Sequence, residues 1–114
     1  MTDQVAILIP RPKVREGSAF TATAYFRDRA TAAASTPTSI KYRVDCLTTG
    51  QNLTDWTTVS AASTATIAIT STYNAIQSDS NSAERKQLTV AANYGLSTQV
   101  TETAVWEVEN NQAY

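Results

Sequence analysis

The sequence predicts an all-β protein, a single antiparallel β-sandwich of about seven strands. Three observations favour this fold class. Apolar residues recur at every second position through most of the chain, which is the period of a half-buried strand. The chain contains 19 Thr and 10 Ser; threonine favours pleated sheets, and good helix formers other than alanine are few. The length of 114 residues suits one domain, residues 1–114, because two cores of half this size would each be marginally stable.

The first half of the chain alternates in three segments. Residues 5–9 predict a short edge strand that closes at Pro10 and Pro12, because proline cannot donate to a β-ladder. Residues 20–26 place phenylalanine and alanine on one face and mostly polar residues on the other. Residues 40–46 alternate most clearly, with charged residues opposite the apolar face. This is expected for an antiparallel sheet with one side in water.

The second half continues the same pattern. Residues 53–59 predict a short irregular strand, and residues 65–69, 88–92 and 100–108 predict three more. A long polar connection, residues 73–83, lies between two of them. The inward parity of the strands predicts a core, with Trp106 between the two sheets: Phe20, Phe26, Ile40, Tyr42, Val44, Ile67, Ile69, Leu88, Val90, Trp106 and Val108.

The composition excludes several classes of function. Because the chain has no His, it lacks His-based acid–base catalysis, the triads built on it, and His-ligated metals. A single cysteine can form neither an internal disulfide nor a thiolate zinc site. The net charge of -1 argues against a nucleic-acid partner. The apolar run at residues 5–9 is too short for a signal peptide or a membrane span, so we expect a soluble protein with no membrane partner.

Two groups of reactive side chains favour a structural interpretation. Cys46 shares the parity of the core, which favours an inert buried thiol over a nucleophile. Asp79, Asn81 and Glu84 are oxygen ligands at short spacing. A calcium loop would add further carboxylates and a glycine at its sharp turn. Their absence favours a solvated loop, and we predict no metal site.

Carboxylates near the end of the chain give a third candidate. Glu102, Glu107 and Glu109 lie on one predicted strand, and carboxylate pairs can serve glycoside hydrolysis. A chain this short has no insertion that would form a substrate cleft. We therefore predict a non-enzymatic protein with no catalytic residues, no cofactor and no small-molecule substrate.

Charge is divided unevenly along the sequence. Residues 1–43 hold seven basic and three acidic groups, a net charge of +4, whereas residues 44–114 have a net charge of -5. Arg11, Lys13 and Arg15 form a basic trio around the two prolines. We predict that this trio is an interaction site that meets an acidic surface on another subunit.

Residues 1–15 are accordingly predicted to be an N-terminal docking arm, since the prolines keep this segment from completing a ladder by itself. For the uneven charge itself, internal pairing is the interpretation that we favour. If the first and last strands are neighbours, the basic trio faces Glu102, Glu107 and Glu109 across the sheet. The two interpretations can coexist.

Local patterns add a resemblance to known β-sandwich families. Residues 88–97 (LTVAANYGLS) are similar to the sixth strand and following turn of fibronectin type III modules. Residues 40–45, residues 55–57 leading to 65–70, and residues 105–110 resemble small immunoglobulin-like virion proteins of tailed bacteriophages. The resemblance implies an immunoglobulin-like sandwich with a structural role in a phage virion.

In that role the chain would be a capsid decoration (cement) protein or a head–tail or tail accessory subunit. The implied partners are capsid, neck or tail proteins, with many copies or a homo-oligomer in each particle. The implied location is the virion, after synthesis in the host cytoplasm. Two alternatives remain open. A carbohydrate- or receptor-binding module would display Tyr73, Tyr94 and Tyr114 in its loops, and an adhesion module would be cut from a larger protein.

Overall fold

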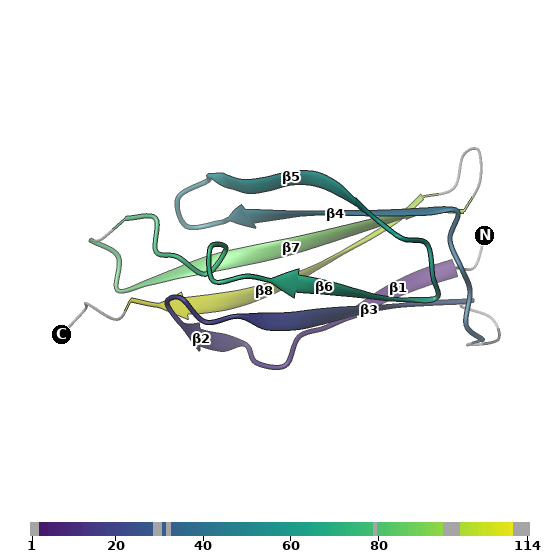
Figure 1. Ribbon diagram of the computed structural model, residues 1–114, viewed down its shortest axis with the longest axis horizontal. Helices are drawn as coiled ribbons and strands as arrows, with labels where there is room; N and C mark the ends of the chain where they lie inside the picture. The colour runs from purple at the N-terminus through teal and green to yellow at the C-terminus, as the bar shows by residue number, and fades with distance from the viewer. Residues whose placement is uncertain (1–2, 29–30, 32, 79, 95–98, 111–114) are drawn as a thin grey trace.

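The fold is seen in a computed structural model that describes residues 3–28, 31, 33–78, 80–94 and 99–110. These residues form eight β-strands (Figure 1). In chain order the strands are β1 (Asp3–Leu8), β2 (Lys13–Arg15), β3 (Phe20–Asp28), β4 (Ser39–Cys46), β5 (Asn52–Val59), β6 (Thr64–Ile69), β7 (Ala83–Asn93) and β8 (Gln99–Glu109). No helix occurs in the described ranges, and so none that is long and apolar enough to cross a membrane. The predicted all-β class is confirmed, with eight strands rather than about seven.

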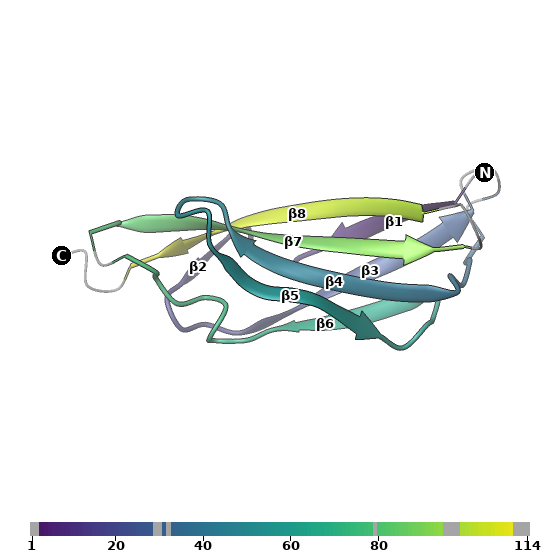
Figure 2. The same ribbon diagram turned by 90° about the horizontal axis from the view of Figure 1, so that it is seen from above.

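The strands form two sheets packed face to face (Figure 1, Figure 2). One sheet has three strands in the order β1-β3-β6, and the other has five in the order β2-β8-β7-β4-β5. The run β8-β7-β4-β5 corresponds to the G-F-C-C′ order of an immunoglobulin-like sandwich. The predicted sandwich is therefore confirmed in its architecture.

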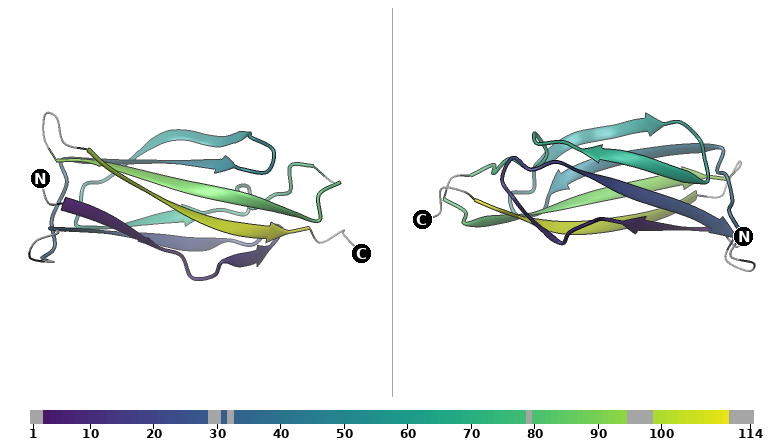
Figure 3. Two further views of the ribbon diagram at one scale, coloured as in Figure 1. Left: turned by 180° about the vertical axis from the view of Figure 1, so that it is seen from behind. Right: turned by 60° about the horizontal axis from the view of Figure 1, so that its bottom comes forward.

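The first predicted strand is divided between the two sheets. β1 pairs antiparallel with β3, and β2 pairs parallel with β8. Pro10 and Pro12 lie between β1 and β2, where the chain leaves one sheet and joins the other, and neither proline can donate to a ladder. Figure 3 shows this crossing along one margin of the sandwich. The pair of β2 and β8 is the one exception to antiparallel pairing among the described strands.

The core lies between the sheets and matches the predicted residues. Nine of the eleven predicted core residues are buried: Phe26, Ile40, Val44, Ile67, Ile69, Leu88, Val90, Trp106 and Val108. Phe20 and Tyr42 are half-buried and pack against this cluster. The Trp106 ring meets Phe20 edge to face, with ring centroids 5.4 Å apart. Its indole N–H donates a 2.7 Å hydrogen bond to Asn74 Oδ1, so the polar edge of the buried ring is satisfied.

Asn74 also fixes the turn between β2 and β3. The side-chain amide of Asn74 donates to the Ser18 carbonyl at 2.7 Å, and the backbone carbonyl of Asn74 accepts from the Gly17 N–H at 3.0 Å. Gly17 has a φ of 81°, a conformation that other residues rarely adopt. The predicted long connection, residues 73–83, thus holds the turn between β2 and β3 through Asn74.

Candidate interaction sites

The basic trio lies at the edge of the five-stranded sheet. Lys13 and Arg15 belong to β2 and stand opposite Glu107 and Glu109 of β8. The Lys13 ammonium is 3.4 Å from the Glu107 carboxylate. Lys13 and Arg15 therefore face glutamates across the sheet, as internal pairing predicts. Glu102 stands farther along β8, beyond the stretch that pairs with β2.

The predicted docking arm is largely part of the domain itself. Residues 3–8 and 13–15 are strands of its two sheets. β1 pairs with β3 along its whole length, from Asp3 to Leu8. Pro10 and Pro12 lie where the chain passes from one sheet to the other, and the strands on both sides of them remain paired within the domain. Binding of a partner by the trio remains a prediction. Of the described residues of the arm, 3–15, the segment 9–12 alone is left outside the ladders.

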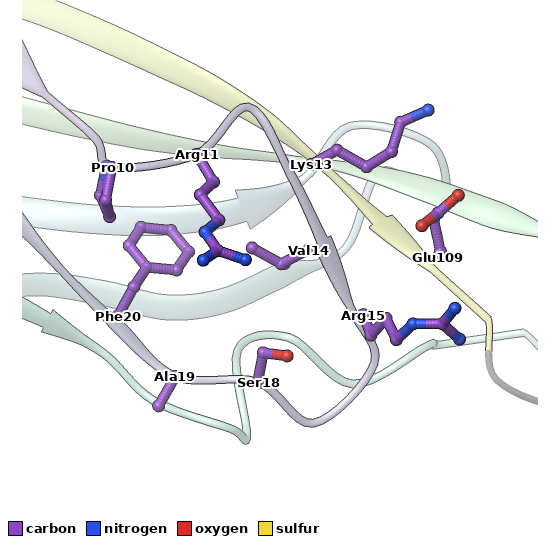
Figure 4. Close-up of a pocket in the computed structure, with 9 residues that line it drawn as sticks. All are labelled: Pro10, Arg11, Lys13, Val14, Arg15, Ser18, Ala19, Phe20 and Glu109. Atoms are coloured by element: carbon purple, nitrogen blue, oxygen red, sulfur yellow. The ribbon is translucent and has the colours of Figure 1, made fainter.

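This crossing leaves a gap in the three-stranded sheet. β1 pairs with β3 only from Asp28 to Thr23, whereas β6 pairs with β3 as far as Phe20. Residues 20–22 of β3 therefore have a strand neighbour on one side alone, among the residues that the structure describes. A cleft of about 560 Å³ opens beside the start of β3 (Figure 4). Its lining residues are Pro10, Arg11, Lys13, Val14, Arg15, Ser18, Ala19, Phe20 and Glu109.

Arg11 gives this cleft its chemical character. Figure 4 shows the Arg11 side chain directed into the cleft, toward Phe20 and Val14, whereas Lys13 is directed away. Within the described ranges no hydrogen bond or ion pair engages the Arg11 guanidinium. The lining holds three cationic residues and one carboxylate, Glu109, above an apolar wall. A carboxylate carried on an extended chain suits this arrangement, because guanidinium binds carboxylate with two parallel hydrogen bonds.

A second surface feature surrounds Trp56 on β5. Trp56 is 41% exposed. The Lys41 ammonium lies 4.7 Å from the ring centroid and the Arg43 guanidinium carbon lies 5.7 Å from it. Arg43 also donates to both oxygens of Asp45, at 2.9 and 3.1 Å. The cations of this cluster already have partners within the chain, so it is less suited to a charged ligand than the cleft is.

Glu84 is a strongly perturbed titratable group. Its carboxylate is fully buried and accepts hydrogen bonds from the N–H groups of Gln77 and Ser78, at 2.7 and 3.0 Å. The Asn81 amide donates at 2.9 Å and the buried Lys86 ammonium at 3.0 Å. Burial alone would raise the pKa of Glu84, but these four donors outweigh it and lower the pKa to about 2.

The predicted solvated loop is therefore wrong for Glu84. β7 begins at Ala83, five residues earlier than the sequence predicts, and Glu84 takes an inward-facing position. Asn81 belongs to the same network, and Asp79 lies outside the described residues. No group of three or more metal-ligating side chains is found in the part of the chain that the structure describes.

The remaining candidates are mostly enclosed. Cys46 is buried, as predicted, and its thiol lies 3.7 Å from a Glu84 carboxylate oxygen. Tyr73 and Tyr94 are half-buried and pack against the core. Burial and the neighbouring Tyr73 raise the pKa of Tyr42. Tyr114 lies outside the described residues. Tyr73 and Tyr94 therefore do not display the aromatic platform expected of the carbohydrate- or receptor-binding alternative.

Comparison with known proteins supports the fold and corrects the role. No protein family and no curated protein matches the sequence. A conjugative transposon lipoprotein from Bacteroides eggerthii has a similar structure, with a TM-score of 0.50 and 10% sequence identity over 92% of this chain and 96% of that chain. At this identity the likeness concerns the fold alone.

The similar structure is not a virion protein, and it contradicts the bacteriophage role. The predictions of a capsid decoration protein, a head–tail or tail subunit, and a virion location are therefore wrong. The stretches that suggested them are alternating strands and tight turns. Such strands and turns recur in immunoglobulin-like sandwiches of many different functions, so they do not indicate one particular role.

Proposed function

We propose that this chain is a non-enzymatic protein-binding domain of the bacterial cell envelope, and that its cleft binds an extended acidic segment of a partner protein. The observation that carries the proposal is the interrupted edge of β3 beside the Arg11 guanidinium. Residues 20–22 of β3 pair with β6 alone among the described strands. Arg11 lines the cleft at this point.

An extended segment fits because the gap continues the line of β1. A peptide that follows on from Leu8 beside β3 would meet backbone groups that no strand of the described chain covers. Such strand addition gives affinity through main-chain hydrogen bonds, while side-chain pockets select the sequence. Phe20 and Val14 offer an apolar wall to every second side chain of that segment.

An acidic segment fits because Arg11, the cation directed into the cleft, meets no carboxylate of the described chain. Arg11, Lys13 and Arg15 line the cleft, against the single carboxylate of Glu109. Lys13 is already engaged by Glu107. Arg11 is therefore the residue expected to bind a carboxylate of the partner, and a hydrogen bond to a charged group contributes about 1.5–3 kcal/mol.

The envelope location and the lack of catalysis rest on separate support. The protein of similar fold is a lipoprotein, a class attached to membranes by lipid. Cys46, the last residue of β4, is 1% exposed, so it is not a point of lipid attachment in the folded domain. The absence of His from the sequence supports a binding role over an enzymatic one.

The test is a titration of the ¹⁵N-labelled domain with a synthetic peptide in which valine alternates with glutamate. We expect amide shifts concentrated in residues 18–22 of the domain. Arg11→Ala should weaken binding about tenfold or more, since one charge-assisted contact is lost. Arg27→Ala is the matched control, because Arg27 lies at the other end of β3 and stacks on Tyr25.

Three outcomes would contradict the proposal. They are no binding at about 1 mM peptide, equal binding of the analogue in which lysine replaces glutamate, and unchanged affinity in Arg11→Ala. Shifts confined to the Trp56 cluster would move the binding site to the outer face of the five-stranded sheet.

A further inference from the structure

The outer edge of β6 has no strand beside it in the described structure. β6 is the last strand of the three-stranded sheet, and β3 is its one ladder partner. It pairs with β3 in an unbroken register, from Thr64 to Ile69. Figure 2 shows β6 at the lower margin of the sandwich. Its backbone groups on that side form a ready template for another strand.

β6 lacks the features that normally protect such an edge. Proteins block edge strands with charged residues, prolines, bulges or very short strands. The sequence from Thr57 to Ser78 contains no charged residue and no proline. The strand itself alternates regularly, with Ala65, Ile67 and Ile69 buried and Thr64, Thr66 and Ala68 exposed.

The other edges are protected. β5 carries Asp55, and its register with β4 shifts near Tyr42 and Val44. β2 has three residues and follows Pro12. β1 is followed closely by Pro10. Of the described edge strands, β6 alone combines an unbroken ladder register with a sequence that has no charged residue.

We propose that β6 pairs antiparallel with β6 of a second copy of this chain. A twofold axis would pass beside Ile67. The two three-stranded sheets would then join as one continuous sheet of six strands. Such a contact is isologous, because the same surface is used on both subunits.

The strand is complementary to itself in this register. Ile67 stands opposite Ile67 of the partner subunit, and Ala65 stands opposite Ile69 of the partner subunit. These residues are all on the buried face of β6. On the outer face, Thr66 stands opposite Ala68 of the partner subunit. Ala65, Ile67 and Ile69 of both copies stay on the core side, whereas a slip by one residue would turn these three residues of one copy to solvent.

The sequence favours a second copy over a different protein at this edge. The strand has no charge to select an oppositely charged partner, and identical uncharged strands meet without repulsion. The inference is independent of the cleft, which lies on the opposite side of β3.

The test is sedimentation equilibrium of the full chain up to about 1 mM, where even a weak dimer is populated. We expect a species of twice the 12.3 kDa monomer mass. The double variant Thr66→Lys/Ala68→Lys places lysines directly opposite each other at two points of the dimer. It should weaken dimerisation about tenfold. Both positions are exposed, so circular dichroism should show an unchanged fold.

Two controls make the test specific. Thr101→Lys/Thr103→Lys adds the same charge at exposed positions of β8 and should leave the dimer intact. An equimolar mixture of Thr66→Lys/Ala68→Lys with Thr66→Glu/Ala68→Glu should restore the dimer, since lysine then faces glutamate. A monomer at every concentration, a dimer that the lysine pair does not weaken, or a mixture that stays monomeric would overturn the proposal.

Discussion

Replacing Glu84 by glutamine should destabilise the fold by removing one charge from a buried ion pair. The Glu84 and Lys86 side chains are both 0% exposed, and their charged atoms are 3.0 Å apart. Glutamine keeps the size of the side chain and one accepting oxygen. It presents an amide where the second oxygen of Glu84 accepts hydrogen bonds. The Lys86 ammonium then keeps its hydrogen bond to the Ala75 carbonyl, 2.9 Å away, but has no anionic partner.

Two routes give the same magnitude for this loss. Breaking a buried pair by removing one partner typically costs about 3–5 kcal/mol, because the other charge is left uncompensated. The pKa of Glu84 falls from its ordinary 4.5 to about 2 in the folded protein. At about 1.4 kcal/mol for each pH unit, this corresponds to about 3 kcal/mol of stabilisation by the ionised carboxylate.

The pH dependence distinguishes this explanation from a simple loss of packing. The folded-state pKa of Glu84 lies below its unfolded value, so its contribution is complete above about pH 4.5 and is lost as the pH falls toward about 2. Glutamine does not titrate. The difference in unfolding free energy between wild type and Glu84→Gln should therefore be about 3 kcal/mol at pH 7 and shrink toward zero at pH 2.

Urea denaturation followed by tryptophan fluorescence measures this difference. Asp45→Asn is the matched control, because the Asp45–Arg43 pair is partly exposed, and such pairs contribute about 0–1 kcal/mol. A gap between wild type and Glu84→Gln that is equal at pH 7 and pH 2.5 would refute the ion-pair explanation.

Three further predictions concern single side chains. Trp106→Ala should cost about 3–5 kcal/mol by urea denaturation, because the ring is 1% exposed and its N–H binds Asn74; a midpoint that hardly moves would remove it from the core. Trp56→Ala should cost less than about 2 kcal/mol in the same assay, since its contact with Lys41 is at the surface; a larger loss would show that the cluster supports the fold. Cys46 should react with a thiol reagent only on unfolding, because it is buried; rapid labelling of the native protein would contradict this.

The strands and the core could be predicted because one face of each sheet is buried. Burial on one face imposes a period of two on the sequence, so residues such as Ile67 and Val90 report their own orientation. The same rule explains the error at Glu84. Glu84 and Lys86 share the parity of Leu88, and both face inward. Parity alone would have extended the strand, but two charged residues at inward positions are expected only when they pair.

The sequence indicates the basic segment around Arg11 but not the cleft that this segment lines. Arg11 and its neighbouring prolines indicated an unusual segment, and charge alone allowed either internal pairing or an external partner. The structure separates the basic trio, since Lys13 binds Glu107 while Arg11 is directed into the cleft. That division depends on where β1 leaves β3, at Leu8 opposite Thr23. Such a register is a long-range property that no local pattern specifies.

The two proposed contacts lie on opposite sides of the three-stranded sheet. In the order β1-β3-β6, the gap beside residues 20–22 lies on the β1 side of β3, and the free edge of β6 lies beyond its other side. Neither contact covers the residues of the other, so a dimer formed through β6 would keep two open clefts. A partner with two acidic segments would then be bound at both, and the second binding event would be intramolecular. The charge-swap variants of β6 and the Arg11 variant therefore act on separable quantities: the first set changes the number of clefts that are joined, and the second changes the affinity of each one.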